Sequence, residues 1–397
     1  MAEPFKAVRI SDRVHWVGAI DWGIRDFHGY STRRGTTYNA YLVLADDVTL
    51  IDTVRAPFKD EFMSRVRSVV DPRDIKVIVS NHSEMDHSGL LPEVVKEVGP
   101  REVIASTMGA KALAEHFHGF DGVVAVKDGE RRSLGNMSLS FYETRMLHWP
   151  DSMVSYLAEE QLLFSQDAFG MHLASSERFD DELDPAVLNE EARKYYANIL
   201  MPFSPVVAKA LARLQALALP TKLVAPDHGP VWRKGIGGIL ASYERWAEQR
   251  PTRKAVVVYD TMWGSTAAMA RAISDGLAAG GASARLLPLA ASGRSDVATE
   301  VLEAGALLVG SSTLNGQMLP RVADVLTYLK GLKPANLIGQ AFGSYGWSGE
   351  AAQHVQDALT QMKVVMVGEP QRCRYVPTTA QLASFRVFGE RVAAQLP

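Results

Sequence analysis

The chain has 397 residues, which is long for a single hydrophobic core, so two domains are expected. Its hydrophobic fraction of 47% and charged fraction of 22% are those of an ordinary soluble globular protein, and a net charge of -3 gives no general attraction to nucleic acid or to an anionic membrane. A single cysteine, Cys373, excludes an intramolecular disulfide and any cysteine-ligated iron-sulfur or rubredoxin-like iron centre built from this chain alone.

The N-terminal residues lack the apolar core of a signal peptide, and no apolar run is long enough to span a membrane. We therefore expect a cytoplasmic protein.

The first half of the chain is predicted to be a mixed α/β domain. Strand-like runs at residues 14–17, 38–45 and 48–52 indicate a hairpin that starts a sheet, and a helix is expected over about 57–70. Further strand and helix patterns follow, at residues 77–79, 103–105, 110–117, 138–164, 184–217 and 223–228.

The rest of the chain is organised around the apolar run Val77–Val79, which leads into a loop with His82, Glu84, Asp86 and His87. Two imidazoles and two carboxylates within six positions are costly to bury unless a cation compensates them. Each residue alone would more often be a solvated loop side chain, but their density predicts a metal site with more than one ion.

Three later residues occupy similar settings. His148, Asp167 and His228 each lie near the end of a strand-like apolar run, so all three are expected to converge with the His82 loop on one edge of a sheet sandwich.

The organisation changes near residue 250. Five strand-like runs follow, at residues 255–259, 285–289, 306–310, 337–342 and 364–368, separated by stretches of helical length. Regular β-α alternation favours a parallel, doubly wound sheet, so domains are expected at residues 1–250 and 252–397.

Three loops of the second domain are candidates for a phosphate and ring site. The first opens a helix, where unpaired backbone donors and the helix dipole attract an anion, although a simple N-cap explains it equally well. The loops comprise Thr261, Met262, Trp263, Gly264, Ser265 and Thr266; Ser311, Ser312, Thr313, Leu314, Asn315 and Gly316; and Ser344, Tyr345, Gly346, Trp347, Ser348 and Gly349. Together they resemble the flavodoxin pattern, which implies flavin mononucleotide (FMN).

The seven candidate ligands resemble, in order and spacing, those of the metallo-β-lactamase fold, whose usual signature has a histidine where this chain has Glu84. A third carboxylate adds a hard, charged donor and favours redox-active iron over zinc. Fused to a flavodoxin-like domain, this pattern resembles the flavodiiron protein family and implies an N-terminal αββα sandwich. The resemblance implies that His82, Glu84 and His148 hold one iron, that Asp86, His87 and His228 hold the other, and that Asp167 bridges them.

The family resemblance also implies a reaction: reduction of dioxygen to water, of nitric oxide to nitrous oxide, or both, with FMN relaying electrons. It implies a separate donor protein such as rubredoxin and a head-to-tail homodimer or dimer of dimers. Tyr195, Tyr196 and His28 are candidates for supporting residues near the irons, whereas His172 and the remaining histidines are interpreted as structural or exposed.

Two other functions remain open at this point. A dizinc hydrolase with a flavodoxin-like regulatory module would not explain Glu84 or the complete flavin loops. A flavin-binding electron carrier with a vestigial first domain would lack ligands, and this chain fills every ligand position.

Overall fold

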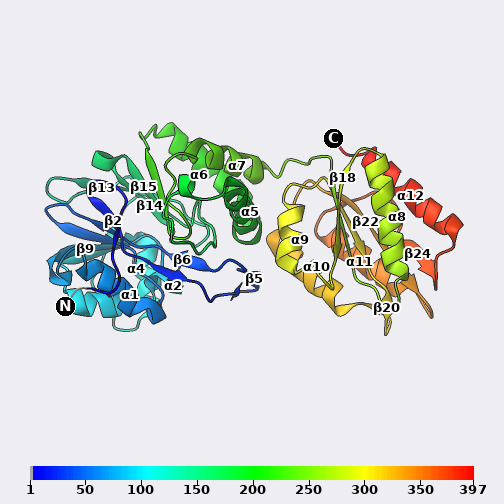
Figure 1. Cartoon of the computed structure of the whole chain (residues 1–397), viewed down its shortest axis with the longest axis horizontal. Helices are drawn as coiled ribbons and strands as arrows, with labels where there is room; N and C mark the ends of the chain where they lie inside the picture. Colours follow the sequence, from blue (N-terminus) through cyan, green and yellow to red (C-terminus); the bar gives the residue numbers. More distant parts are fainter. Residues whose placement is uncertain (1–2) are drawn as a thin grey trace. The chain divides into compact units, whose positions relative to one another are not determined.

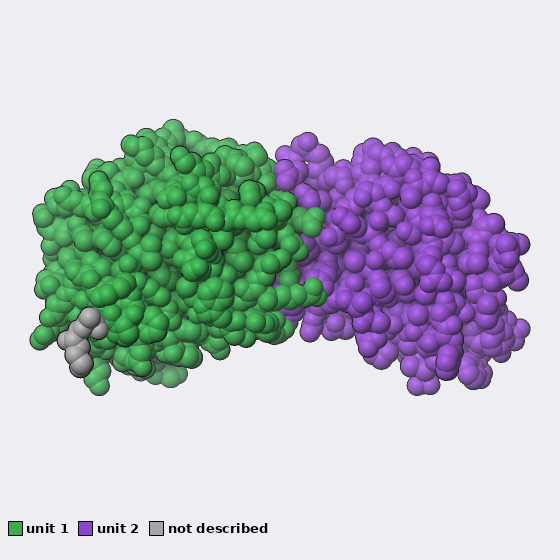
Figure 2. Space-filling model, viewed as in Figure 1, with its two compact units in different colours: residues 1–28, 32–195, 205–244 green, residues 29–31, 196–204, 245–397 purple. Residues whose placement is uncertain are grey.

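The computed structural model describes residues 3–397 and divides into two compact units (Figures 1 and 2). Unit 1 contains the described residues up to His28, together with Thr32–Tyr195 and Pro205–Glu244. Unit 2 contains Gly29–Ser31, Tyr196–Ser204 and Arg245–Pro397.

The first sheet of unit 1 has seven strands and carries the chain into the His82 loop. Its strands pair antiparallel from β1 to β8 and parallel from β8 to β11. The predicted hairpin is confirmed, since Leu42 pairs with Leu50. The strand order is β1 (Val8–Arg9), β2 (Val14–Trp16), β7 (Tyr41–Val43), β8 (Val48–Ile51), β9 (Ile75–Ser80), β10 (Glu102–Ser106) and β11 (Val123–Val126).

The second sheet packs face to face against the first. Val79 and Ile104 of the first sheet share one buried cluster with Phe141 and Phe164 of the second, so the main core of unit 1 lies between the sheets. The strand order is β12 (Arg131–Ser133), β13 (Ser138–Glu143), β14 (Met153–Leu157), β15 (Leu162–Gln166) and β16 (Leu223–Pro226).

Helices cover the outer faces of both sheets. Because successive strand residues point to opposite faces, Ile78 points away from the core between the sheets and joins a second cluster with residues of α1, α3 and α4. On the other side, Tyr156 packs with Leu214 of α6. The predicted αββα sandwich is confirmed. The helices are α1 (Lys59–Arg67), α2 (Met85–Ser88), α3 (Leu91–Val98), α4 (Thr107–His116), α5 (Pro185–Tyr195), α6 (Ser204–Ala216) and α7 (Ile236–Glu248).

Short elements complete this part of the chain. A π-helical turn spans Tyr196–Leu200 directly after α5. The short strands are β3 (Ala19–Asp21), which pairs with β6 (Thr36–Tyr38), and β4 (Asp26–Phe27) and β5 (Tyr30–Ser31).

Unit 2 has a parallel sheet in the order β18, β17, β19, β22, β24, in which every neighbouring pair is parallel. Numbered along the chain this is the order 2-1-3-4-5 of flavodoxin-like sheets, so the predicted doubly wound fold is confirmed. The bounds are β17 (Lys254–Tyr259), β18 (Ser283–Pro288), β19 (Ala306–Gly310), β22 (Ile338–Tyr345) and β24 (Gln371–Arg374).

Five helices accompany this sheet, and Figure 1 shows them around it. Residues of α8 and α12 share a buried cluster with Val257 and Leu308 on one face of the sheet. The two helices approach closely at Gly276, where an added Cβ would lie 1.9 Å from the carbonyl oxygen of Arg386. The helices are α8 (Ser265–Ala279), α9 (Arg294–Val301), α10 (Pro320–Leu332), α11 (Glu350–Gln361) and α12 (Thr379–Ala393).

The prediction of the fifth strand at 364–368 is confirmed only in part, because the strand there is short and the sheet is completed by a later strand. Only β23 (Val365–Met366) pairs there, with the first two residues of β22. The chain then leaves the sheet through Gly368 and Pro370, and pairing with β22 resumes at β24. The strand that completes the sheet carries two exposed arginines, Arg372 and Arg374, and so lacks the apolar run by which the others are recognised.

Candidate functional site

The end of β9 and the short helix α2 position the His82 loop. Asn81 anchors the loop, because its backbone N–H and its side-chain amide each donate a 2.8 Å hydrogen bond to the carboxylate of Asp52. The Ser88 hydroxyl donates to the Ser83 carbonyl at 2.7 Å and so fixes the turn into α2. Every residue from Asn81 to Ser88 except Met85 is buried.

One group of predicted ligands surrounds one oxygen of Asp167. Asp167 Oδ2 lies 3.3 Å from His82 Nε2 and 3.1 Å from His148 Nε2. Glu84 Oε2 lies 3.1 Å from the same nitrogen of His148. His82, Glu84, His148 and Asp167 therefore face a common point.

A second group adjoins the other oxygen of Asp167, which lies 3.6 Å from His228 Nε2. Asp86 Oδ2 lies 3.2 Å from His228 Nε2 and 3.4 Å from His87 Nε2, and the two Nε2 atoms are 3.2 Å apart. Nitrogens bound to one metal at about 2.1 Å lie about 3 Å from each other, so this spacing suits a shared ion. The structure brings together all seven residues predicted as ligands.

Many polar atoms of this cluster are buried without a hydrogen-bond partner. They include both carboxylate oxygens of Asp86, both of Asp167, and Nε2 of His82. Such atoms are costly in a protein interior unless a cation or a hydrogen bond satisfies them. Four imidazoles and three carboxylates form a mixed nitrogen and oxygen donor set that fits two iron ions.

The protonation of the cluster follows from the same contacts. Burial lowers the pKa of His148, but the carboxylates of Asp167 and Glu84 outweigh burial and raise the pKa to about 9. Burial acts to raise the pKa of Asp86, whereas His87 and His228 lower it well below its ordinary value. Asp86 is therefore ionised at neutral pH, as a metal ligand must be.

His228 is oriented by the backbone. Its Nδ1 lies 2.6 Å from the carbonyl oxygen of Thr37, which can only accept a hydrogen bond. The proton of the neutral ring therefore sits on Nδ1, and Nε2 is left to bind a metal.

Two residues near the cluster were not predicted from the sequence. His172, interpreted as structural or exposed, is fully buried with its ring 4.7 Å from that of His228 and its Nδ1 2.8 Å from Thr36 Oγ1. Asp227 lies with its Oδ2 3.3 Å from His82 Nδ1. The sequence could have indicated Asp227, because it directly precedes the predicted ligand His228, whereas no local pattern marks His172.

The three candidate supporting residues differ in their surroundings. The buried ring of Tyr195 lies 5.1 Å from His172 and 6.1 Å from His228. Tyr196 belongs to unit 2, where its ring packs 5.4 Å from Trp246. His28 has a side chain that is 78% exposed and an Nε2 atom 3.9 Å from Glu84 Oε1, so it stands between solvent and the cluster.

Unit 2 has a pocket of about 670 Å³ formed by the three predicted loops. Thirteen of the eighteen predicted residues line it, and Tyr375 and Val376, which follow β24, also line it and were not predicted. Trp263 and Trp347 lie on this pocket with 92% and 95% of their surfaces exposed. The predicted residues that do not line it are Thr261, Gly264, Thr266, Ser311 and Gly349.

Thr266 does not line the pocket, but its hydroxyl contacts two residues that do. Its buried hydroxyl lies 3.0 Å from Ser312 Oγ and 2.9 Å from Ser344 Oγ, at the N-terminal end of α8. Clustered hydroxyls beside a helix N-terminus suit a phosphate monoester, and the open apolar part of the pocket suits a planar ring. The pocket therefore fits a flavin nucleotide.

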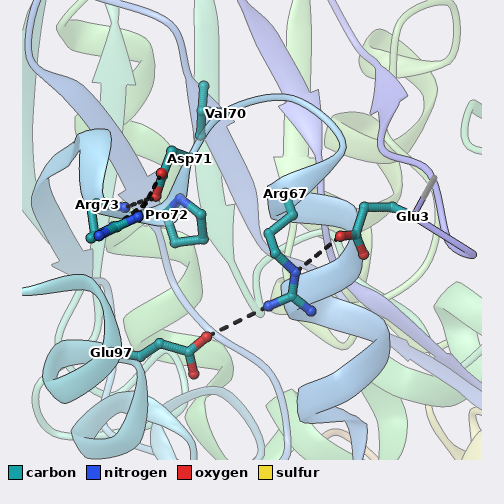
Figure 3. A pocket seen from close by; sticks show the side chains of 7 residues that line it. All are labelled: Glu3, Arg67, Val70, Asp71, Pro72, Arg73 and Glu97. Atoms are coloured by element: carbon teal, nitrogen blue, oxygen red, sulfur yellow. Dashed lines mark hydrogen bonds and ion pairs between the residues drawn. The ribbon is translucent and has the colours of Figure 1, made fainter. Parts of the chain in front are cut away.

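A pocket of about 490 Å³ on unit 1 has a different character (Figure 3). Arg67 pairs there with Glu3 and Glu97, and Arg73 pairs with Asp71. Each charged side chain that lines this pocket pairs with another one, so the pocket offers no unpaired charged group to a ligand.

Comparison with known families agrees with this geometry. A family model described as "ODP family beta lactamase" matches residues 36–229, and the flavodoxin model matches residues 257–387. A nitric oxide reductase of Moorella thermoacetica is 45% identical over 400 residues, covering 100% of both chains. A rubredoxin-oxygen oxidoreductase of Megalodesulfovibrio gigas is 44% identical over 98% of both chains.

Solved structures give the same result. The rubredoxin oxygen:oxidoreductase from Desulfovibrio gigas matches with a TM-score of 0.96 at 43% identity, covering 98% of both chains. The flavodiiron protein from Giardia intestinalis matches with a TM-score of 0.94 at 32% identity, covering 98% of this chain and 96% of that one.

Proposed function

The chain belongs to the flavodiiron protein family, and we propose that it is an oxidoreductase that reduces dioxygen to water, nitric oxide to nitrous oxide, or both. The observation that carries this proposal is Asp167, whose two oxygens face two separate groups of ligands, in a chain that also has a flavin-type pocket. Relatives named for oxygen and for nitric oxide reduction are nearly equally similar, so the preferred gas is left to experiment.

We assign the metal ligands by their grouping. His82, Glu84 and His148 would hold one iron, and Asp86, His87 and His228 would hold the other. Asp167 would bridge the two ions.

The pocket of unit 2 would hold FMN, with Thr266, Ser312 and Ser344 near its phosphate and Trp263 and Trp347 beside its ring. When bound, FMN and the two irons supply the electrons and the open coordination positions that reduction of a diatomic gas requires. The buried cluster limits access of water to those positions.

Both reactions consume protons as well as electrons. His28 lies between solvent and Glu84, so its imidazole can pass protons toward the cluster. Tyr195 contacts the rings of His172 and His228, and its hydroxyl stays protonated because burial raises its pKa well above the ordinary value.

We also propose two partners. A separate donor of the rubredoxin type would supply electrons, as the name of one relative indicates for that protein. A second copy of the chain, placed head to tail, would cover Trp263 and Trp347, because indole rings that are more than nine-tenths exposed commonly mark an interface.

The deciding experiment is metal and flavin analysis of the purified protein, followed by anaerobic assays of oxygen and nitric oxide consumption with a reduced donor. We expect two irons and one FMN per chain, and consumption of at least one of the two gases. Protein with only zinc and no gas consumption would refute it and favour a hydrolase.

The described helices include none that is both long enough and apolar enough to cross a membrane. A cytoplasmic location remains a proposal, to be tested by cell fractionation.

A further inference from the structure

The cluster contains one further contact, between the imidazole of His82 and a carboxylate outside the seven proposed ligands. Asp227 Oδ2 lies 3.3 Å from Nδ1 of His82, the ring atom opposite to the Nε2 that faces Asp167. Both side chains are buried, with 2% or less of their surfaces exposed. Asp227 therefore faces the back of a proposed iron ligand.

The backbone fixes Asp227 in place on both sides. Its N–H donates to the Gln166 carbonyl at 2.9 Å, and its carbonyl accepts from the Asn39 N–H at 2.7 Å. The preceding residue, Pro226, accepts hydrogen bonds of 2.7 Å from the Asn39 amide and from the Tyr41 hydroxyl. With its backbone held in this way, the carboxylate has little freedom to leave the His82 ring.

A carboxyl group beside Nδ1 favours the tautomer with its proton on that atom. The other nitrogen, Nε2, then carries the lone pair that binds a metal. For His228 the backbone carbonyl of Thr37 performs this role. For His82 the group beside Nδ1 is a side-chain carboxylate 3.3 Å away, so it can be replaced by mutation without altering the backbone.

We propose that Asp227 is a positioning residue that fixes the tautomer and the ring orientation of His82 and thereby sets the affinity of the iron site on that side. This inference rests on the proposed metal site, but it does not depend on which gas is reduced. Loss of a group that orients a metal ligand commonly weakens metal binding or activity by about 10- to 100-fold.

The test uses the full-length protein after removal of metal by chelation, titrated with Co²⁺, whose visible spectrum reports binding. Asp227→Ala should weaken binding to the first group of ligands by about 10- to 100-fold. Asp227→Asn keeps an oxygen that can accept from Nδ1, so it should lose less affinity than the alanine variant.

Asp180→Asn is the matched control. Asp180 is also a buried carboxylate of unit 1, but its two oxygens accept hydrogen bonds from the backbone N–H groups of Arg233 and Gly235 rather than facing an imidazole. Its Co²⁺ affinity should stay within about threefold of the wild type, well below the effect expected for loss of an orienting group. Thermal unfolding of each chelated variant shows whether it has folded.

A second readout concerns the tautomer directly. In the Co²⁺ protein, the Nδ1 proton of His82 should give a hyperfine-shifted NMR signal that exchanges slowly with solvent and that broadens or disappears in Asp227→Ala.

Equal affinities and unchanged signals in Asp227→Ala and wild type would overturn the inference, as would equal losses in Asp227→Ala and Asp180→Asn. A wild-type protein that binds no metal would instead overturn the proposed function. The two failures are therefore distinguishable.

Discussion

Glu84 Oε2 lies 3.1 Å from His148 Nε2, where the usual metallo-β-lactamase signature has a second histidine in place of Glu84. This contact gives the first group of ligands one carboxylate of its own in addition to the shared Asp167. A hard oxygen donor of this kind favours iron, and its negative charge favours the higher oxidation state.

Glu84→His should therefore shift the metal preference toward zinc. We expect the ratio of iron to zinc to fall by about tenfold or more, because a neutral nitrogen donor replaces a charged oxygen donor. The measurement is metal content after expression with equal iron and zinc in the medium. Glu93→His is the control, since Glu93 is an exposed residue of α3 that pairs with Lys59. An unchanged ratio in Glu84→His would contradict the role assigned to this carboxylate.

His148 should make the stability of the chelated protein depend on pH. Against the effect of burial, Asp167 and Glu84 raise its pKa to about 9, whereas a histidine in the unfolded chain has a pKa of about 6.5. Its stabilising contribution is therefore complete below about pH 6.5 and is lost as the pH rises through about 9. The loss should be on the order of 3 kcal/mol, a 2.5-unit shift at 1.36 kcal/mol per unit.

Urea unfolding of the chelated protein at pH 6 and pH 9.5 measures this loss. His148→Gln lacks the titrating group and should show a shallower dependence. The same pH dependence in both proteins would show that other groups are responsible. Iron-loaded protein should not show the loss, because a metal-bound imidazole carries no proton on the bound nitrogen.

The metal-site residues that could be predicted are those that a local sequence pattern marks. Four ligands fall within six positions, so their density was visible, and His148, Asp167 and His228 each follow a strand. Asp227 and His172 act through contacts with His82 and His228, which only the folded chain creates. A single histidine or aspartate in an apolar stretch carries no sign of which residue it will contact.

Two structural features could not be predicted from local sequence patterns. Tyr195 and Tyr196 are adjacent on a helix and so point about 100° apart, and the sequence could not decide which one would face the ligands. The fifth strand of unit 2 was placed at an apolar run, but the strand that completes the sheet is β24, with Arg372 and Arg374 exposed at its edge. Hydropathy identifies buried central strands better than exposed edge strands.

Thr266→Val should weaken FMN binding without changing metal content. The substitution removes a hydroxyl that lies within 3.0 Å of Ser312 Oγ and Ser344 Oγ, so two hydroxyls of the proposed phosphate site lose a hydrogen-bond partner. A cost of about 1–2 kcal/mol corresponds to an increase of about 5- to 30-fold in the dissociation constant. Quenching of FMN fluorescence by the flavin-free protein measures it.

Thr360→Val serves as its control, because the Thr360 hydroxyl donates to the Gln356 carbonyl within α11. An FMN affinity equal to that of the wild type in Thr266→Val would argue against a phosphate at the N-terminal end of α8.

The exposed indoles of Trp263 and Trp347 should stabilise the proposed dimer. Trp263 and Trp347 are 92% and 95% exposed, and large apolar side chains at the centre of an interface often contribute about 2 kcal/mol or more to binding. Replacing both with alanine should therefore raise the dimer dissociation constant by about tenfold or more, as measured by sedimentation over a range of protein concentrations. Val387→Ser, which alters a half-exposed apolar residue of α12, should leave the dissociation constant unchanged. A wild-type chain that stays monomeric at every concentration would exclude the proposed dimer, whereas a dimer unaffected by loss of both indoles would place its interface elsewhere on the chain.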